Sequence, residues 1–170
     1  SLVWEEIKTP EPRKDEVLIK ISATAINRAD LAQRAGNYPP PEGETDILGL
    51  ECSGKIVKVG ENVSDERIGE EVCALLAGGG YAEYVCCPSI QAIKTPTNLS
   101  LIESASLPEV FATCWLNLFL EGNLSQGQNI LLHAGASGIG TAAIQLCSSF
   151  GANSFVTVGS EEKLRFCLEP

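Results

Sequence analysis

A chain of 170 residues, 44% hydrophobic and 20% charged, has the length and composition of a globular protein with one domain or slightly more. Its 12 Lys and Arg residues against 22 Asp and Glu residues give a formal net charge of −10, which argues against binding to a nucleic-acid backbone. No apolar run approaches the roughly 20 residues that span a bilayer, so no membrane segment is expected.

The cysteines are odd in number and form no C-x-x-C pair, and most of them lie within apolar runs. This pattern is typical of reduced, buried thiols in a cytoplasmic protein rather than of disulfides or a metal site. The start of the chain also lacks the basic and apolar regions of a signal peptide. The seven residues are Cys52, Cys73, Cys86, Cys87, Cys114, Cys147 and Cys167.

Short strands separated by Gly and Pro are predicted over the first 100 residues. This pattern is typical of a small barrel or sandwich. One short helix is expected at 27–35, between strands. The predicted strands cover residues 17–21, 56–59, 72–76 and 81–86.

The pattern becomes helical near residue 100. Ser100 and Glu103 have the spacing of a capping box. Pro108 is expected to separate a short first turn from a longer helix over 109–121, which is apolar on almost every side and therefore predicted to be buried.

A β-α-β unit of 30 residues is predicted over 129–158, which is the expected size. Three branched aliphatic residues mark a buried strand at 129–133, and a glycine-rich turn follows. A helix at 141–150 and a second strand at 155–158 complete the unit, after which Ser160 is expected to cap a helix that begins at Glu161.

The glycine-rich turn resembles the dinucleotide fingerprint G-x-G-x-x-G, with a serine at the middle glycine. That chemistry requires a tight turn, close approach of the backbone to a diphosphate, and helix N-terminal amides that face the phosphates. The alternative is a tight strand-to-helix turn without a ligand, but the flanking strand and helix favour a cofactor. The predicted contacts are Gly135, Ser137, Gly138, Ile139 and Gly140.

The end of the second predicted strand favours NADPH over NAD. NAD sites usually place an acidic residue there, whereas this chain has Gly159 followed by Ser160, with Lys163 one helical turn later. A hydroxyl and an ammonium group suit an additional 2′-phosphate. Glu161 and Glu162 would oppose that phosphate if they faced it, although acidic residues also suit a first helical turn.

Three stretches together resemble the zinc-free quinone oxidoreductases of the medium-chain dehydrogenase/reductase superfamily, particularly the branch related to zeta-crystallin and its tumour-suppressor-inducible relatives. They are residues 27–41, 48–60 and 133–146. The resemblance implies an α/β protein in which a β-rich GroES-like barrel domain, residues 1–100, precedes the first part of a Rossmann domain, residues 101–170. Two of the six strands of a doubly wound sheet would be present, so the chain is expected to be a truncated form of a protein that is a homodimer at full length.

The resemblance also implies that no metal is bound. Zinc-dependent relatives carry Gly-His-Glu where this chain has Gly49, Leu50 and Glu51, and they carry a Cys near the position of Asn27. His133 is the single histidine, and packing at a strand end is its simpler role.

The implied reaction is reduction of a small-molecule quinone by NADPH. The resemblance assigns Asn27 to the nicotinamide end of the cofactor, Tyr38 to the substrate mouth, and Thr113 to the nicotinamide. Structural alternatives are a helix cap for Asn27, an aromatic plug for Tyr38 and a buried helical threonine for Thr113, and Asp30 is expected to be structural. A zinc-free enoyl or enone reductase and a non-enzymatic, crystallin-like NADPH-binding protein remain alternative functions.

Overall fold

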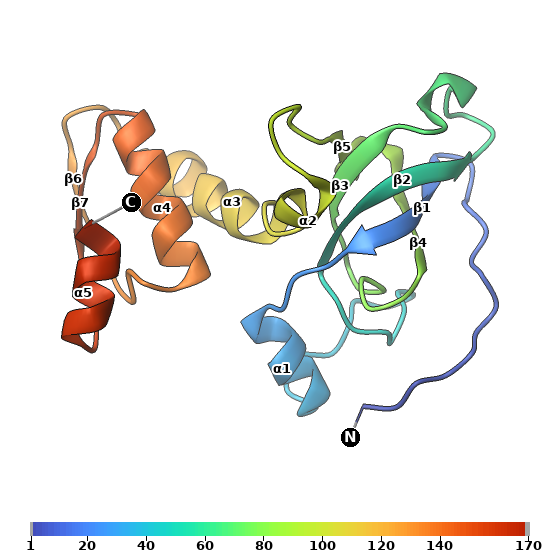
Figure 1. Ribbon diagram of the computed structural model, residues 1–170, viewed down its shortest axis with the longest axis horizontal. Helices are drawn as coiled ribbons and strands as arrows, with labels where there is room; N and C mark the ends of the chain where they lie inside the picture. Colours follow the sequence, from blue (N-terminus) through green and yellow to red (C-terminus); the bar gives the residue numbers. More distant parts are fainter. Residues whose placement is uncertain (1, 169–170) are drawn as a thin grey trace. The chain divides into compact units, whose positions relative to one another are not determined.

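The computed structural model describes residues 2–168, and its contacts divide the chain into two compact units. The first unit is Ser1–Glu109 and the second is Val110–Pro170. Both contain strands and helices, which confirms the predicted α/β class (Figure 1).

A curled antiparallel sheet of five strands forms the first unit (Figure 1). All of the strand runs predicted in this region lie in or beside strands, but the fourth begins at Tyr84 rather than at residue 81, because residues 78–83 form a turn. A fifth strand was not predicted. In spatial order the strands are β4 (Tyr84–Pro88), β1 (Glu16–Ala23), β2 (Glu51–Val59), β3 (Glu71–Leu75) and β5 (Ala92–Lys94).

The core of the first unit lies on one face of this sheet. Val17 and Ile19 point to this face of β1 and are completely buried, and Leu18 between them is buried as well. Val17 and Ile19 pack with residues of the other four strands, and most of this cluster is less than 6% exposed. Its buried members are Val17, Ile19, Cys52, Ile56, Val72, Ala74, Leu76, Val85, Cys87 and Ala92.

Short helices connect or follow the strands. Helix α1 (Arg28–Arg34) lies between β1 and β2, as predicted, and α2 (Leu101–Ser104) follows β5. The predicted capping box at α2 is confirmed: the Ser100 amide donates to Glu103 Oε2 at 2.8 Å, and the Glu103 amide donates to Ser100 Oγ at 3.3 Å. Two single 3-10 turns, Asp65–Arg67 and Ser89–Gln91, complete the unit.

The helix predicted over 109–121 is interrupted. Helix α3 (Pro108–Trp115) starts one residue earlier, with proline in the first turn where its missing N–H is harmless. The backbone then widens into a π-helical segment, Leu116–Glu121, and the Gly122 amide donates to Asn117 O at 3.0 Å, five residues back.

A parallel β-α-β unit follows, as predicted. Strand β6 (Asn129–Leu132) pairs with β7 (Asn153–Val156), and α4 (Gly138–Ser149) connects them. Two predicted boundaries are wrong: α4 begins at Gly138 rather than at 141, and β7 covers 153–156 rather than 155–158. The parallel register sets the second boundary, because Asn129 pairs with Asn153 and their side chains hydrogen-bond at 2.9 Å.

Helix α4 covers one face of this two-stranded sheet. Ile130 and Leu132 pack against Ala142, Ala143 and Cys147 of the helix. The paired residues Leu131 and Phe155 point to the other face and remain 60% and 58% exposed.

Helix α5 (Glu161–Leu168) ends the described region and begins where the sequence predicts. The Lys163 amide donates to Ser160 Oγ at 3.3 Å, so Ser160 acts as the expected cap. Positions 169–170, to which the predicted helix extended, lie outside the described residues. Within residues 2–168, no helix combines the length and the apolar character needed to cross a bilayer.

Candidate functional site

The glycine turn lies directly after β6, at the carboxyl end of the parallel strands. A Cβ on Gly135 would lie 2.6 Å from Cβ of Val156 in β7. A Cβ on Gly140 would lie 2.6 Å from Ala134 O and would also meet Gly135 O. Glycine is therefore required at both ends of the turn, first for strand packing and then for close approach of helix and loop.

Ser137 is the N-cap of α4, and its Oγ accepts from the Gly140 amide at 3.1 Å. The amides of Gly138 and Ile139 are the first two of the helix, and neither has a hydrogen-bond partner within residues 2–168. Both residues are exposed. Two unpaired N–H groups at the positive end of a helix dipole form a site suited to a phosphate anion.

The residues predicted to select the cofactor follow β7 at the same edge of the sheet. The turn and the end of β7 are joined by a hydrogen bond from the Gly135 amide to Thr157 O at 3.0 Å. A Cβ on Gly159 would meet nothing within 4 Å, so open space lies beside this residue. Lys163 is exposed, and within the described part of the chain it forms no ion pair.

In the first unit, Asn27 is the N-cap of α1 and belongs to a buried polar network. Its backbone amide donates to Asp30 Oδ2 at 2.7 Å, and its side-chain Nδ2 donates to Glu51 Oε1 at 2.8 Å. The other oxygen of Glu51 accepts from the Glu109 amide at 2.9 Å. Asp30 and Glu51 are 2% and 1% exposed, so two carboxylates are buried on either side of Asn27.

Tyr81 completes this network, because its hydroxyl donates to Asp30 Oδ2 at 2.9 Å. Burial, followed by the hydrogen bond to Asp30 and the charges of Asp30 and Glu51, raises the pKa of the Tyr81 phenol to about 12. Tyr81 therefore keeps its proton and serves as a donor at neutral pH. Neither Tyr81 nor Glu51 was singled out from the sequence. The local sequence Gly49-Leu50-Glu51 indicates a lost zinc ligand at Leu50 but gives no sign of the role of Glu51.

The remaining predicted residues lie on separate elements. Tyr38 is 47% exposed in the loop after α1, ahead of three consecutive prolines. Thr113 is half-buried in α3, where its backbone oxygen accepts from Asn117 Nδ2 at 2.8 Å. His133 is exposed, with Nδ1 3.0 Å from Thr157 Oγ1. In the second unit the turn and residues 159–163 thus follow the carboxyl ends of the two paired strands, and in the first unit Asn27 contacts Asp30 and Glu51.

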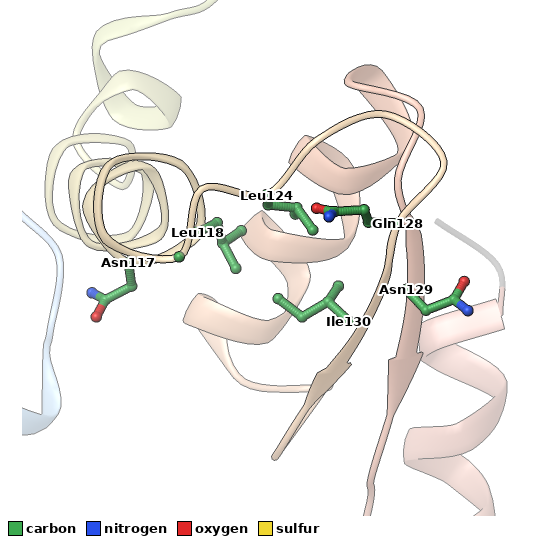
Figure 2. Close-up of a pocket in the computed structure, with 7 residues that line it drawn as sticks. Asn117, Leu118, Leu124, Gln128, Asn129 and Ile130 are labelled. Carbon is green, nitrogen blue, oxygen red and sulfur yellow. The ribbon is translucent and has the colours of Figure 1, made fainter.

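A hollow of about 420 Å³ lies elsewhere in the second unit (Figure 2). Asn129 is the first residue of β6, so this hollow is at the amino end of the strand, whereas the glycine turn follows the carboxyl end. Ligands of doubly wound sheets bind outside the carboxyl ends, so we assign the candidate site to the turn. The hollow is lined by Asn117, Leu118, Gly122, Leu124, Gln128, Asn129 and Ile130.

Most of the thiols are buried and poorly ionised. Burial raises the pKa of Cys52, Cys73, Cys114 and Cys147, and raises that of Cys87 to about 12. Because the thiolate is the nucleophile, these residues are structural rather than reactive. Across the described residues, no three His, Cys, Asp or Glu side chains gather closely enough to hold a metal ion.

Comparison with known proteins identifies the fold. Residues 13–97 match the alcohol dehydrogenase GroES-like domain. The chain is 37% identical over 155 residues to a highly-reducing polyketide synthase of Aureobasidium melanogenum, covering 91% of this chain and 7% of that protein. Among solved structures, CurK enoyl reductase superposes with a TM-score of 0.89 at 30% identity, covering 98% of this chain and 52% of that one. The quinone oxidoreductase of Coxiella burnetii superposes with a TM-score of 0.84 at 32% identity, covering 95% and 53%.

The chain therefore spans about half the length of these solved structures and a small part of the polyketide synthase. The family match covers the antiparallel sheet, the N-cap Asn27 of α1 and Glu51 in β2, and the superpositions extend over the β-α-β unit as well. The chain belongs to the alcohol dehydrogenase GroES-like domain family, with the fold of the medium-chain dehydrogenase/reductase superfamily.

Proposed function

We propose that the protein reduces quinones with NADPH. The observation that carries this proposal is the glycine turn with its two unpaired helix N-terminal amides, together with the open space and the exposed lysine that follow β7. A diphosphate suits the amides, and the 2′-phosphate of NADPH suits Ser160 and Lys163. The likeness to the Coxiella burnetii quinone oxidoreductase supports the choice of substrate.

The residues present fit a dinucleotide. Gly135 and Gly140 allow the tight turn, and a Cβ at either position would disrupt it. No carboxylate ends β7, where an acidic residue would favour NAD through the ribose hydroxyls. When bound, NADPH supplies the hydride that reduces the substrate.

The residues of the chain position the reactants in this proposal. Asn27 orients the nicotinamide end, and Thr113 packs beside it. The hydroxyl of Tyr38 donates to a carbonyl oxygen of the quinone, which takes over the polarising role that zinc has in other members of the superfamily. The quinone gains a hydride and a solvent proton to become a hydroquinone, and NADPH is oxidised to NADP⁺.

Reduction of an enoyl thioester is the second candidate, and the likeness to CurK enoyl reductase favours it. A carbon–carbon double bond conjugated to a carbonyl accepts hydride at the β-carbon and a proton at the α-carbon. The same cofactor site serves both reactions, so the two candidates differ only in the substrate that is accepted.

Calorimetry with NADPH and NADH, followed by NADPH oxidation with an ortho-quinone and with an enoyl thioester, tests both candidates. Lys163→Ala is expected to weaken NADPH binding about 10-fold, because a charge-assisted contact to the 2′-phosphate is lost, and to leave NADH binding unchanged. Lys55→Ala is the matched control, since Lys55 is an exposed lysine of the first unit that pairs with Glu71. Absence of NADPH binding would exclude the proposal, and turnover of the thioester alone would select the second candidate.

A further inference from the structure

The loop after α1 presents consecutive prolines to solvent. Tyr38, Pro39 and Pro41 are exposed, and Pro40 is half-buried. Proline fixes φ at about −65°, and a residue that precedes proline is restricted to extended or polyproline II values of ψ. Each of the first three of these residues precedes a proline. The sequence itself therefore holds residues 38–41 in the polyproline II conformation.

Backbone hydrogen bonds fix both ends of this segment. Helix α1 ends in a Schellman motif, in which the Asn37 amide donates to Ala32 O at 2.9 Å and Gly36 has a φ of 79°. On the other side, the Glu44 amide donates to Pro41 O at 3.1 Å and closes a β-turn. The segment is thus ordered before any partner binds, which lowers the entropy cost of binding.

The segment makes few contacts with its own chain. Within residues 2–168, neither the amide nor the hydroxyl of Tyr38 forms a hydrogen bond. A Cβ on Gly36 or on Gly43 would meet nothing within 4 Å, so open space adjoins both flanks. A polyproline II helix has about three residues per turn, so Tyr38 and Pro41 share a face. This face presents an aromatic ring, 47% exposed, and an exposed proline.

The residues that follow the prolines are acidic. Glu42, Glu44 and Asp46 are exposed, and none of them forms an ion pair within the described part of the chain. Charge complementarity across an interface guides association and selects between similar partners. A groove that fits this segment therefore has Lys or Arg side chains beside the end that receives Pro41.

We infer that residues 38–46 are a docking segment for a partner domain with an aromatic-lined polyproline groove bordered by basic residues. Grooves of this kind occur in WW, SH3 and EVH1 domains, where they exploit the order that a polyproline II segment has before binding. The competing explanation is purely structural, because proline also restricts the unfolded chain and so stabilises a loop. The inference uses neither the cofactor nor the substrate of the proposed function.

NMR titration of isotope-labelled WW, SH3 and EVH1 domains, each with the full unlabelled chain, tests the inference. We expect the aromatic groove residues of at least one domain to shift, and Pro39→Ala/Pro41→Ala to weaken that binding at least about 10-fold. Pro88→Ala/Pro96→Ala is the matched control, because both prolines are exposed in the same unit and neither has a proline neighbour. Absence of binding to all three domains, or equal losses in the two variants, would overturn the inference.

Three further measurements identify what the domain contacts. Glu42→Gln/Glu44→Gln should weaken binding about 3-fold and reduce its dependence on salt, whereas Glu66→Gln, a change at another exposed glutamate, should do neither. An unaltered affinity in the first of these variants would contradict the basic border. The domain's own proline-rich peptide should displace the chain, and failure to do so would place the contact outside the groove and overturn the inference.

The third measurement separates docking from folding and from catalysis. Urea denaturation should show that every variant is folded under the titration conditions. A purely structural role predicts lower stability for Pro39→Ala/Pro41→Ala without any binding by the unmodified protein. Docking uses the ring of Tyr38, whereas the proposed function uses its hydroxyl. Tyr38→Phe should therefore keep the affinity for the domain, and loss of that affinity would contradict the assigned face.

Discussion

The two units of the chain bury their apolar surface to different extents. The five-stranded sheet of the first unit encloses a cluster in which Val17, Ile19 and Val72 are completely buried. The second unit has two strands, and α4 covers only one face of them, so that Leu131 and Phe155 are more than half exposed. A two-stranded sheet with one open face has little independent stability. The first unit thus holds its polar network beside a well-packed core, whereas the glycine turn belongs to a less completely packed unit.

Core truncation should give the largest effect and tests this difference directly. Ile19→Ala removes a fully buried side chain from the first unit, and we expect it to lower the free energy of unfolding by about 2–5 kcal/mol. Leu131→Ser removes an exposed side chain from the second unit and should change it by less than about 0.5 kcal/mol. Urea denaturation measures both. A cost for Leu131→Ser that approaches that of Ile19→Ala would mean that the open face is covered in solution.

Substitutions in the glycine turn should have the next largest effect. Gly135→Ala and Gly140→Ala place a Cβ within 2.6 Å of Val156 and of Ala134 O, respectively, and should each destabilise the protein by about 1–3 kcal/mol. Gly159→Ala is the matched control for stability, because its Cβ enters open space, and it should cost less than about 0.5 kcal/mol. Equal losses of stability at all three positions would show that replacing any glycine has this effect, and that the close contacts around Gly135 and Gly140 are not its cause.

The turn was predictable because its signals are local. Glycines at both ends, a capping serine and flanking aliphatic runs identify the β-α-β unit within 30 residues. The boundaries of β7 were missed because they depend on pairing with β6, including the contact between Asn129 and Asn153. Strand β5 was missed for the same reason, since three residues form a strand only where β3 supplies the partner.

The polar network around Asn27 could not be derived from local patterns. Glu51 is 24 residues from Asn27 and 58 from Glu109, and Tyr81 is 51 residues from Asp30. A buried glutamate within an apolar strand is a signal that such partners exist, because an unpaired carboxylate would not be tolerated there. The sequence alone does not identify which residues they are. The π-helical segment at Leu116–Glu121 could not be derived from local patterns either, because its residues are equally compatible with an ordinary α-helix.

The smallest predicted effect concerns Tyr81 and is a pH dependence confined to alkaline conditions. The phenol has a pKa of about 12 in the folded protein, against about 10 in an unfolded chain. Below the lower value both states are protonated and the stabilisation from the bond to Asp30 is fully present. Between the two values the unfolded state loses its proton first, so stability should fall as the pH rises towards 12.

Tyr81→Phe isolates this contribution. It should lower the free energy of unfolding by about 1 kcal/mol at neutral pH, because the buried Asp30 carboxylate loses one of its two donors. Tyr81→Phe should also reduce the loss of stability between about pH 10 and about pH 12. The thiols of Cys86 and Cys87, whose pKa values burial raises to about 11 and about 12, act in the same direction, so the difference between the two proteins is the informative quantity. Tyr84→Phe is the control. It keeps the hydrogen bond between Tyr81 and Asp30, so the loss of stability at alkaline pH should remain. Parallel pH profiles for the unmodified protein and Tyr81→Phe would show that the phenol ionises equally in both states, and that the network holds Asp30 without it.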